Sequence, residues 1–156
     1  MTSAVERRLE NAGMTLPEAA AAAGNYVPFT KSGTTLYVSG QVPFEAGRIA
    51  VSGRLGDGVS LEDGQEAARI CALNILAQAR AALDGDLDRV VRCLKLGGFV
   101  AATAEFTDHP KVINGASDLM VTAFEDAGRH ARFAVGVASL PLGAAVEVDA
   151  IFEIRS

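Results

Sequence analysis

The segment from residue 130 to residue 139, HARFAVGVAS, combines a single arginine with unusually small neighbours. If this segment forms a strand, alternate side chains point to opposite faces of the sheet. Arg132 then shares a face with Ala134 and Gly136, while the bulkier Phe133 and Val135 share the other face. A guanidinium group can bind a carboxylate through two parallel, charge-assisted hydrogen bonds. The pattern therefore predicts a nearly bare face on which Arg132 meets a small ligand or a partner chain.

A glutamate near the C-terminus is the second candidate for chemistry. The last strand is expected over 145–154, and its apolar side chains, beginning with Val146, should pack with Phe133 beneath helices. Glu147 has the opposite parity, which would place it on the same face as Arg132. If the last two strands pair directly as a hairpin, Glu147 lies across from Gly136 or a neighbour of that residue.

An arginine, a carboxylate and open space between them suit the hydrolysis of a small electrophile that carries a carboxylate. Arg132 would bind the carboxylate, and Glu147 would hold a water molecule and act as general base and then as general acid. The structural alternative is an ion pair of Arg132 with Glu147, with Asp149 or with an acidic group of another subunit. Structural ion pairs are common, and the residues alone leave both interpretations open.

The elements that must position these residues predict an α+β domain. Residues 1–25 form an N-terminal extension with a helix over 3–12, and residues 26–156 form the domain itself. Strands are expected at 26–30, 34–42, 48–51 and 90–104 and on both sides of the 140–143 connection, and helices at 60–83 and 110–127. The result is a sheet of about six strands with two helices on one face. The other face needs a cover, which a homo-oligomer would supply.

Composition excludes several classes of function. The net charge is −5 and no run of lysine and arginine occurs, which argues against a nucleic-acid partner. No stretch approaches about 20 apolar residues, so we expect a soluble cytoplasmic protein that does not bind membranes. His109 and His130 lack the spacing of metal ligands, and no metal site is expected. His130 is interpreted as a loop histidine at the entry to the strand.

Three features together resemble the RidA/YjgF family, once called endoribonuclease L-PSP. They are SGQVPF at 39–44, ARFAVGVASLPLGAAVEVDAI at 131–151, and the order of the elements from about Tyr26 to Ile154. The resemblance implies a chorismate-mutase-like fold and a homotrimer with clefts between its subunits. It also implies an enamine/imine deaminase that needs no metal or organic cofactor. Such an enzyme hydrolyses reactive imino acids of the 2-aminoacrylate type to 2-oxo acids and ammonia.

The resemblance also implies roles for individual residues. Arg132 matches the arginine that grips the substrate carboxylate, and Glu147 matches the glutamate associated with the hydrolytic water. The residues that match the lining of the cleft are Tyr26, Ser39, Gly40 and Asn114. Each of these four has an ordinary structural alternative, namely a strand aromatic, a turn at the end of a strand, or a solvated helix side chain.

One departure from the family pattern bears on activity. The best-known branch has Ser-Cys after the arginine, where this chain has Phe133-Ala134. Ala134 removes a polar side chain from the expected cleft, so the range of substrates and the rate are open. A trimeric module that binds small carboxylates or regulates a partner without catalysis is therefore the alternative function. RNA cleavage, which the older family name suggests, is disfavoured by the acidic charge.

Overall fold

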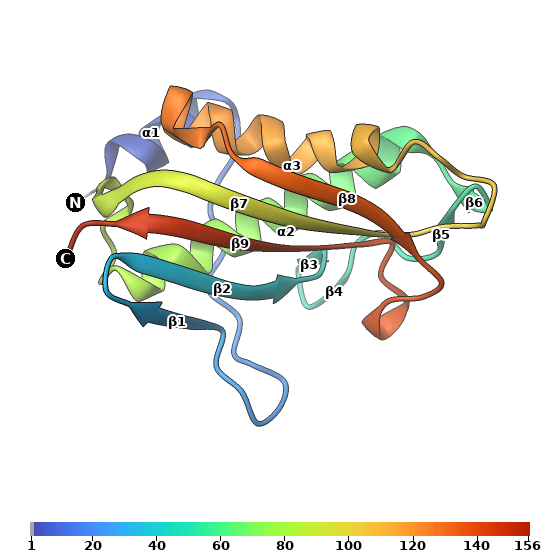
Figure 1. Cartoon of the computed structure of the whole chain (residues 1–156), viewed down its shortest axis with the longest axis horizontal. Helices are drawn as coiled ribbons and strands as arrows, with labels where there is room; N and C mark the ends of the chain where they lie inside the picture. Colours follow the sequence, from blue (N-terminus) through green and yellow to red (C-terminus); the bar gives the residue numbers. More distant parts are fainter. Residues whose placement is uncertain (1) are drawn as a thin grey trace.

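Five strands form one mixed sheet in the order β1–β2–β9–β7–β8 (Figure 1). The computed structural model describes residues 2–156. The strands of the sheet are β1 (Phe29–Ser32), β2 (Thr35–Gln41), β7 (Val90–Ala101), β8 (Ala131–Val137) and β9 (Val146–Ile154). Outside it lie two short pairs, β3 (Phe44–Glu45) with β4 (Arg48–Ile49), and β5 (Arg54–Leu55) with β6 (Gly58–Val59). The expected sheet of about six strands thus has five in the described chain.

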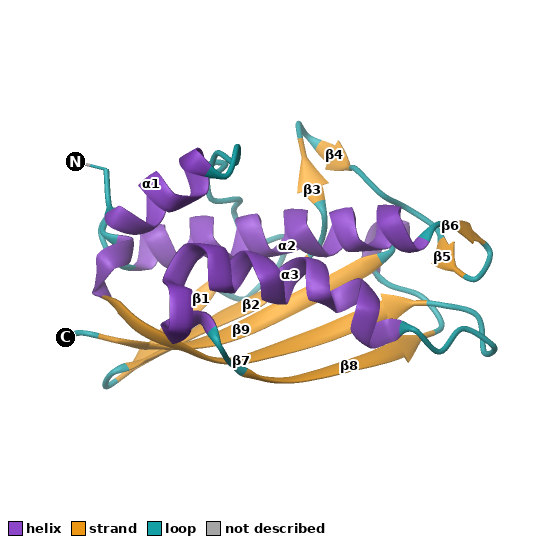
Figure 2. Ribbon diagram, turned by 90° about the horizontal axis from the view of Figure 1, so that it is seen from above, coloured by secondary structure: helices purple, strands orange, loops and turns teal. Residues whose placement is uncertain are grey.

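Two long helices, α2 (Leu61–Ala82) and α3 (His109–Phe124), cover one face of this sheet (Figure 2). Within residues 2–156 no element covers the opposite face. This confirms the predicted α+β class with two helices on one side. The remaining helical elements are α1 (Ala4–Asn11), η1 (Leu87–Arg89), η2 (Glu125–Gly128) and η3 (Pro141–Gly143). None of the helices between residues 2 and 156 is both long and apolar enough for a membrane crossing.

Local capping explains where α1 and α2 begin. The Ser60 hydroxyl accepts a hydrogen bond from the backbone N–H of Asp63 at the start of α2. Ser3 and Glu6 form a full capping box at the start of α1. The apolar side of α1 buries Val5 and Leu9 in the main hydrophobic core. The first helix is therefore part of the packed structure.

The glycine pair of β7 marks two close approaches to the strand. A side chain at Gly98 would collide with Ile113 of α3, because a Cβ there would lie 2.6 Å from Ile113 Cγ1. A side chain at Gly97 would meet Phe133 and Asp149 on the opposite face. The pair therefore marks close approaches and not a bulge. The register shifts of β7 fall earlier, between residues 90 and 95.

The expected hairpin between the last two strands is wrong, because β7 lies between them. Val100 of β7 pairs with Gly136 of β8 on one side and with Val146 of β9 on the other. Glu147 consequently pairs with Phe99 and not with Gly136. The connection over 138–145 is longer than a tight hairpin loop. Backbone hydrogen bonds also join this connection to residues 51–53: Gly53 donates to Gly143, and Ala145 donates to Val51. The connection thus passes the end of β7 before β9 begins.

The contact between α2 and α3 depends on a glycine. A Cβ at Gly115 of α3 would run into the backbone carbonyl of Gln65 in α2, and backbone cannot move aside as a side chain can. We predict that Gly115→Ala lowers the free energy of unfolding by about 2 kcal/mol through overpacking. Chemical denaturation at fixed protein concentration measures this change.

Gly64→Ala in α2 is the matched control. A Cβ at Gly64 would meet only the side-chain ends of Leu55 and Val112, at 3.1 and 3.2 Å, and alanine favours the helix by about 1 kcal/mol. This variant should stay within about 1 kcal/mol of the parent protein. Equal losses in both variants would contradict the close backbone approach.

Candidate functional site

Arg132 lies on the helix-covered face of the sheet, opposite to the face that the sequence pattern predicts for it. Leu96 of β7 pairs with Arg132 on one side and with Ala150 on the other, and paired residues share a face. Leu96 and Ala150 are buried in the core beneath the helices. Glu147 pairs with Phe99 and therefore points to the uncovered face. The expectation that Arg132 and Glu147 share a face is wrong within one chain.

The small residues of β8 make room for α3. A Cβ at Gly136 would lie 2.5 Å from Nε2 of His109, the first residue of α3. Ala134 packs against the hydrophobic core. The bulky residues Phe133 and Val135 share the uncovered face with Phe99. The expectation that Phe133 packs with Val146 beneath the helices is therefore wrong. The nearly bare face is thus occupied by a helix along most of its length.

The Arg132 guanidinium lies against α3 and is held there by neutral groups. Nη1 donates to Asn114 Oδ1 at 2.9 Å and to Ser117 Oγ at 3.1 Å, and Nη2 donates to the carbonyl of Pro110 at 3.3 Å. None of the ion pairs within residues 2–156 includes Arg132. The side chain is oriented but its charge is not neutralised inside its own chain, so it can still bind an anion.

Two further residues lie behind this arginine: His130, interpreted from the sequence as a loop histidine, and Ser117, which the sequence did not single out. His130 Nδ1 lies 2.6 Å from the carbonyl of Gly128, which can only accept, so Nδ1 carries the proton. Nε2 then accepts from the hydroxyl of Ser117 at 2.9 Å. Burial, followed by the charge of Arg132, lowers the pKa of His130. His130 is half-buried, and its interpretation as a simple loop histidine is incomplete.

The spacing of these residues contains the signal that would have found them. Asn114 and Ser117 are three residues apart, which places them on one side of a helix. His130 and Arg132 are two residues apart along the chain entering a strand, which directs both toward the same side. Four polar groups therefore converge where the middle of α3 passes the beginning of β8.

Glu147 belongs to a second group of residues on the uncovered face. A Cβ at Gly40 of β2 would lie 3.1 Å from the carboxyl carbon of Glu147, so this glycine leaves the acid accessible from β2. Burial raises the pKa of Glu147, and the neighbouring Asp149 carboxylate raises it further. Burial also raises the pKa of Asp149. A carboxyl group whose pKa moves toward neutrality is better suited to accept and return a proton.

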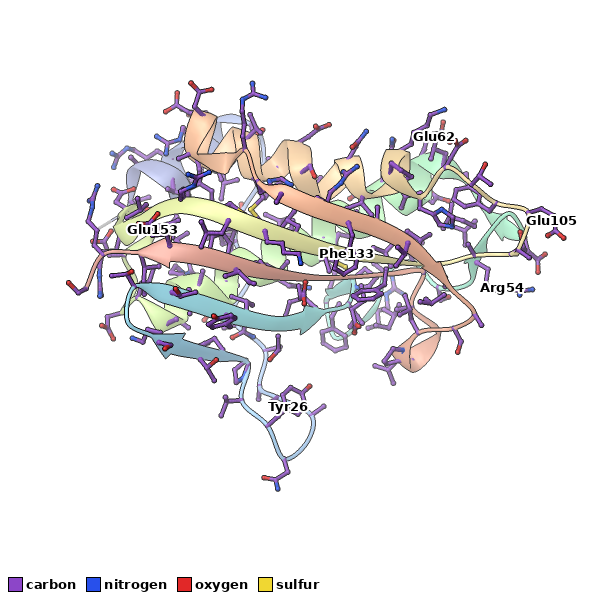
Figure 3. All side chains as sticks on the ribbon, viewed as in Figure 1. Tyr26, Arg54, Glu62, Glu105, Phe133 and Glu153 are labelled. Carbon is purple, nitrogen blue, oxygen red and sulfur yellow. The ribbon has the colours of Figure 1, made fainter. Side chains whose placement is uncertain are left out.

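Tyr26, Ser39 and Gly40 line one cavity of about 210 Å³ beside β2. Tyr26 lies in a loop ahead of β1 and is 58% exposed (Figure 3), so the strand expected from residue 26 begins only at Phe29. Ser39 Oγ donates to the carbonyl of Val27 at 2.9 Å, which ties this loop to β2. Alanines 20–23 of the N-terminal segment form another wall of the cavity.

The predicted site residues therefore fall into two groups. Arg132 and Asn114 lie at the β8 edge on the helix side, whereas Glu147 and Gly40 lie on the uncovered face near β2, with Tyr26 and Ser39 beside them. Two strands, β7 and β9, separate β8 from β2 in the sheet. Within one chain the two groups therefore lie apart, on opposite faces of the sheet.

Comparison with known proteins adds three findings. The "YjgF/chorismate_mutase-like, putative endoribonuclease" family matches residues 6–154. Protein TCP17 of Trypanosoma cruzi is 51% identical over 153 residues, which are 97% of this chain and 95% of that protein. The crystal structure of Atu1372 from Agrobacterium tumefaciens, a protein of unknown function, is 56% identical with a TM-score of 0.92, and the match covers 97% of this chain and 92% of that one.

A more distant similarity links the chain to a solved RidA. The crystal structure of RidA from the Antarctic bacterium Psychrobacter is 29% identical, with a TM-score of 0.60. The match covers 88% of this chain and 94% of that one.

The raised pKa of Glu147 leads to a testable prediction. Asp149→Asn removes the neighbouring negative charge, so the pKa of Glu147 should fall toward its ordinary value while the contribution of burial remains. An NMR titration of the Glu147 side-chain carboxyl carbon measures the shift. Glu153→Gln, further along the same face of β9, should leave that pKa unchanged. An unaltered Glu147 pKa in the Asp149→Asn variant would show that the two acids do not interact.

Proposed function

Because the chain belongs to the YjgF/RidA family, with its chorismate-mutase-like fold, we propose that it is an enamine/imine deaminase. The substrates would be reactive 2-imino acids and the corresponding enamines, of the 2-aminoacrylate type, and the products a 2-oxo acid and ammonia. The single observation that carries the proposal is the Arg132 guanidinium, which neutral α3 groups orient and no acid within residues 2–156 neutralises. It is a binding group for the carboxylate that all these substrates share.

The reaction needs one water molecule and one group that moves protons. Water attacks the imine carbon, forming a C–O bond, while Glu147 accepts a proton from that water. The nitrogen is protonated, the C–N bond breaks and ammonia leaves, so that imine plus water becomes 2-oxo acid plus ammonia. An iminium carbon is already electrophilic, so positioning and proton transfer supply most of what is required. The raised pKa of Glu147 favours this role.

A second copy of the chain would complete the site. Arg132 and Glu147 lie on opposite sides of their own sheet, so a ligand bound by both must lie between two subunits. The uncovered face supports such an assembly, because Tyr37 and Val135 on it remain 45% and 42% exposed. A ring of three chains repeats one heterologous contact three times and fits the family expectation of a trimer.

Arg132→Ala tests the carboxylate anchor. Loss of two hydrogen bonds to a charged group removes at least about 3 kcal/mol, so kcat/KM for 2-aminoacrylate should fall about 100-fold or more. The measurement is the release of 2-oxo acid in a coupled assay. Arg129→Ala is the matched control, because Arg129 is exposed, three residues away, and pairs with Asp126. It should keep the parent activity.

The same assay separates the rival functions. Turnover by the Arg132→Ala variant at the rate of the parent protein would refute the role of Arg132 as carboxylate anchor. Tight binding of a 2-oxo acid by the parent protein, with no effect on the decay of 2-aminoacrylate, would favour a binding module over an enzyme.

Mixed assemblies test whether the site lies between subunits. We predict that Arg132→Ala and Glu147→Gln are each inactive alone. After joint unfolding and refolding at equal amounts, about one quarter of the inter-subunit sites should regain an intact pair, because each site draws its two residues from different chains. Recovery of activity toward that fraction supports the arrangement. Absence of any recovery in an assembly shown by native mass spectrometry to be mixed would place both residues in one chain's own site.

A further inference from the structure

We propose that His130 and Ser117 are positioning residues that set the orientation of the Arg132 guanidinium, through a directed chain of hydrogen bonds. The inference rests on the proposed function, since it explains how Arg132, the proposed carboxylate anchor, is held in its orientation. It concerns two residues that contact no substrate themselves and act only through Arg132.

The direction of each hydrogen bond follows from the one before it. The Gly128 carbonyl fixes the proton of His130 on Nδ1, which leaves a lone pair on Nε2. The Ser117 hydroxyl has a single hydrogen, and it is used to donate to that lone pair. The lone pairs of Ser117 Oγ are then available to accept from Arg132 Nη1 at 3.1 Å. His130 thereby keeps Ser117 facing Arg132 as an acceptor.

Asn114 and Pro110 complete the support but do not replace it. Asn114 is exposed and its amide can turn, and the Pro110 carbonyl accepts at a longer distance of 3.3 Å. Ser117 is half-buried and is held by His130 from behind. Loss of the His130 acceptor would free the hydroxyl to rotate, and the guanidinium would keep fewer fixed partners.

Protonation of His130 would reverse the chain. Nε2 would then donate to Ser117 Oγ, and the hydroxyl would link two cations, the imidazolium and the guanidinium. The charged side chains on the elements around His130 are Lys111 and Asp118 on α3, Glu125 and Asp126 in η2, Arg129 and Arg132 at the start of β8, and Arg92 and Lys95 on β7. Burial lowers the pKa of His130 most; among these charges, that of Arg132 lowers it further, whereas the hydrogen bond to the Gly128 carbonyl raises it.

The first experiment measures binding without relying on turnover. Isothermal titration calorimetry with 2-oxobutanoate at pH 7.5 should show affinity about three- to tenfold weaker for His130→Ala and for Ser117→Ala, the range expected for one lost hydrogen bond. His130→Gln retains an acceptor for Ser117 and should stay within about twofold of the parent protein. His109→Gln, at the chain's other histidine, is the matched control and should not change the affinity.

The second experiment uses pH as a readout that a merely structural role would not change. The parent protein and His130→Gln both retain Glu147 and Asp149, whose pKa values burial raises, so a difference between their two affinity profiles from about pH 5 to 8 reports on His130. Affinity of the parent protein should fall as the pH drops through the lowered pKa of His130. The His130→Gln variant should show no such fall. An identical pH profile in both proteins would overturn the proposal.

The third readout separates this proposal from the proposed function. Rotation of the Arg132 guanidinium, measured by nitrogen-15 NMR in the absence of ligand, should be faster in His130→Ala and Ser117→Ala than in the parent. If the parent protein binds no carboxylate but the rotation rate responds, the deaminase proposal fails and the positioning role stands. If neither rotation nor affinity changes in folded His130→Ala, the positioning role is refuted.

Discussion

The arrangement of this molecule depends on one guanidinium that is fully oriented yet not neutralised. Asn114, Ser117 and the Pro110 carbonyl satisfy hydrogens of Arg132 without bringing a negative charge to it. Neutral acceptors compensate for lost hydration and leave the charge of the guanidinium available. A carboxylate partner would also have compensated for hydration, but it would have neutralised the charge. The arginine side chain has therefore already lost much of its conformational freedom, which would reduce the entropic cost of binding an anion. The helix α3 supplies all three acceptors and so acts as the frame of the site.

The groups needed for the proposed reaction lie on opposite faces of the sheet. The helix side holds the cation at the β8 edge, and the uncovered side holds two acids, Glu147 and Asp149, whose pKa values burial raises. Keeping the cation and the acids apart prevents them from pairing inside one chain, where they would form a stable but inert ion pair. Assembly of copies would bring opposite charges together only at the place where a ligand binds. The same assembly would cover apolar side chains such as Tyr37 and Val135.

The extent to which sequence predicts this structure differs between elements. The periodicity of apolar residues predicts α2 and α3, because this signal is local to each helix. The face of Arg132 could not be predicted in this way. It depends on which strand lies between β8 and β9, and that is set by the long-range pairing of β7. The small residues Ala134 and Gly136 make room for α3. From the sequence alone, space left by small side chains could equally be filled by a helix or by a ligand. The support by His130 and Ser117 arises from the same packing.

The most direct test of the central claim is a crystal structure of the assembled protein with 2-oxobutanoate bound. The account predicts that the ligand carboxylate forms paired hydrogen bonds with Arg132, while the Asn114 and Ser117 contacts persist and Glu147 of a second copy faces the carbonyl carbon. A structure in which Arg132 is instead paired with an acid of the adjacent subunit, with the ligand bound elsewhere, would contradict it.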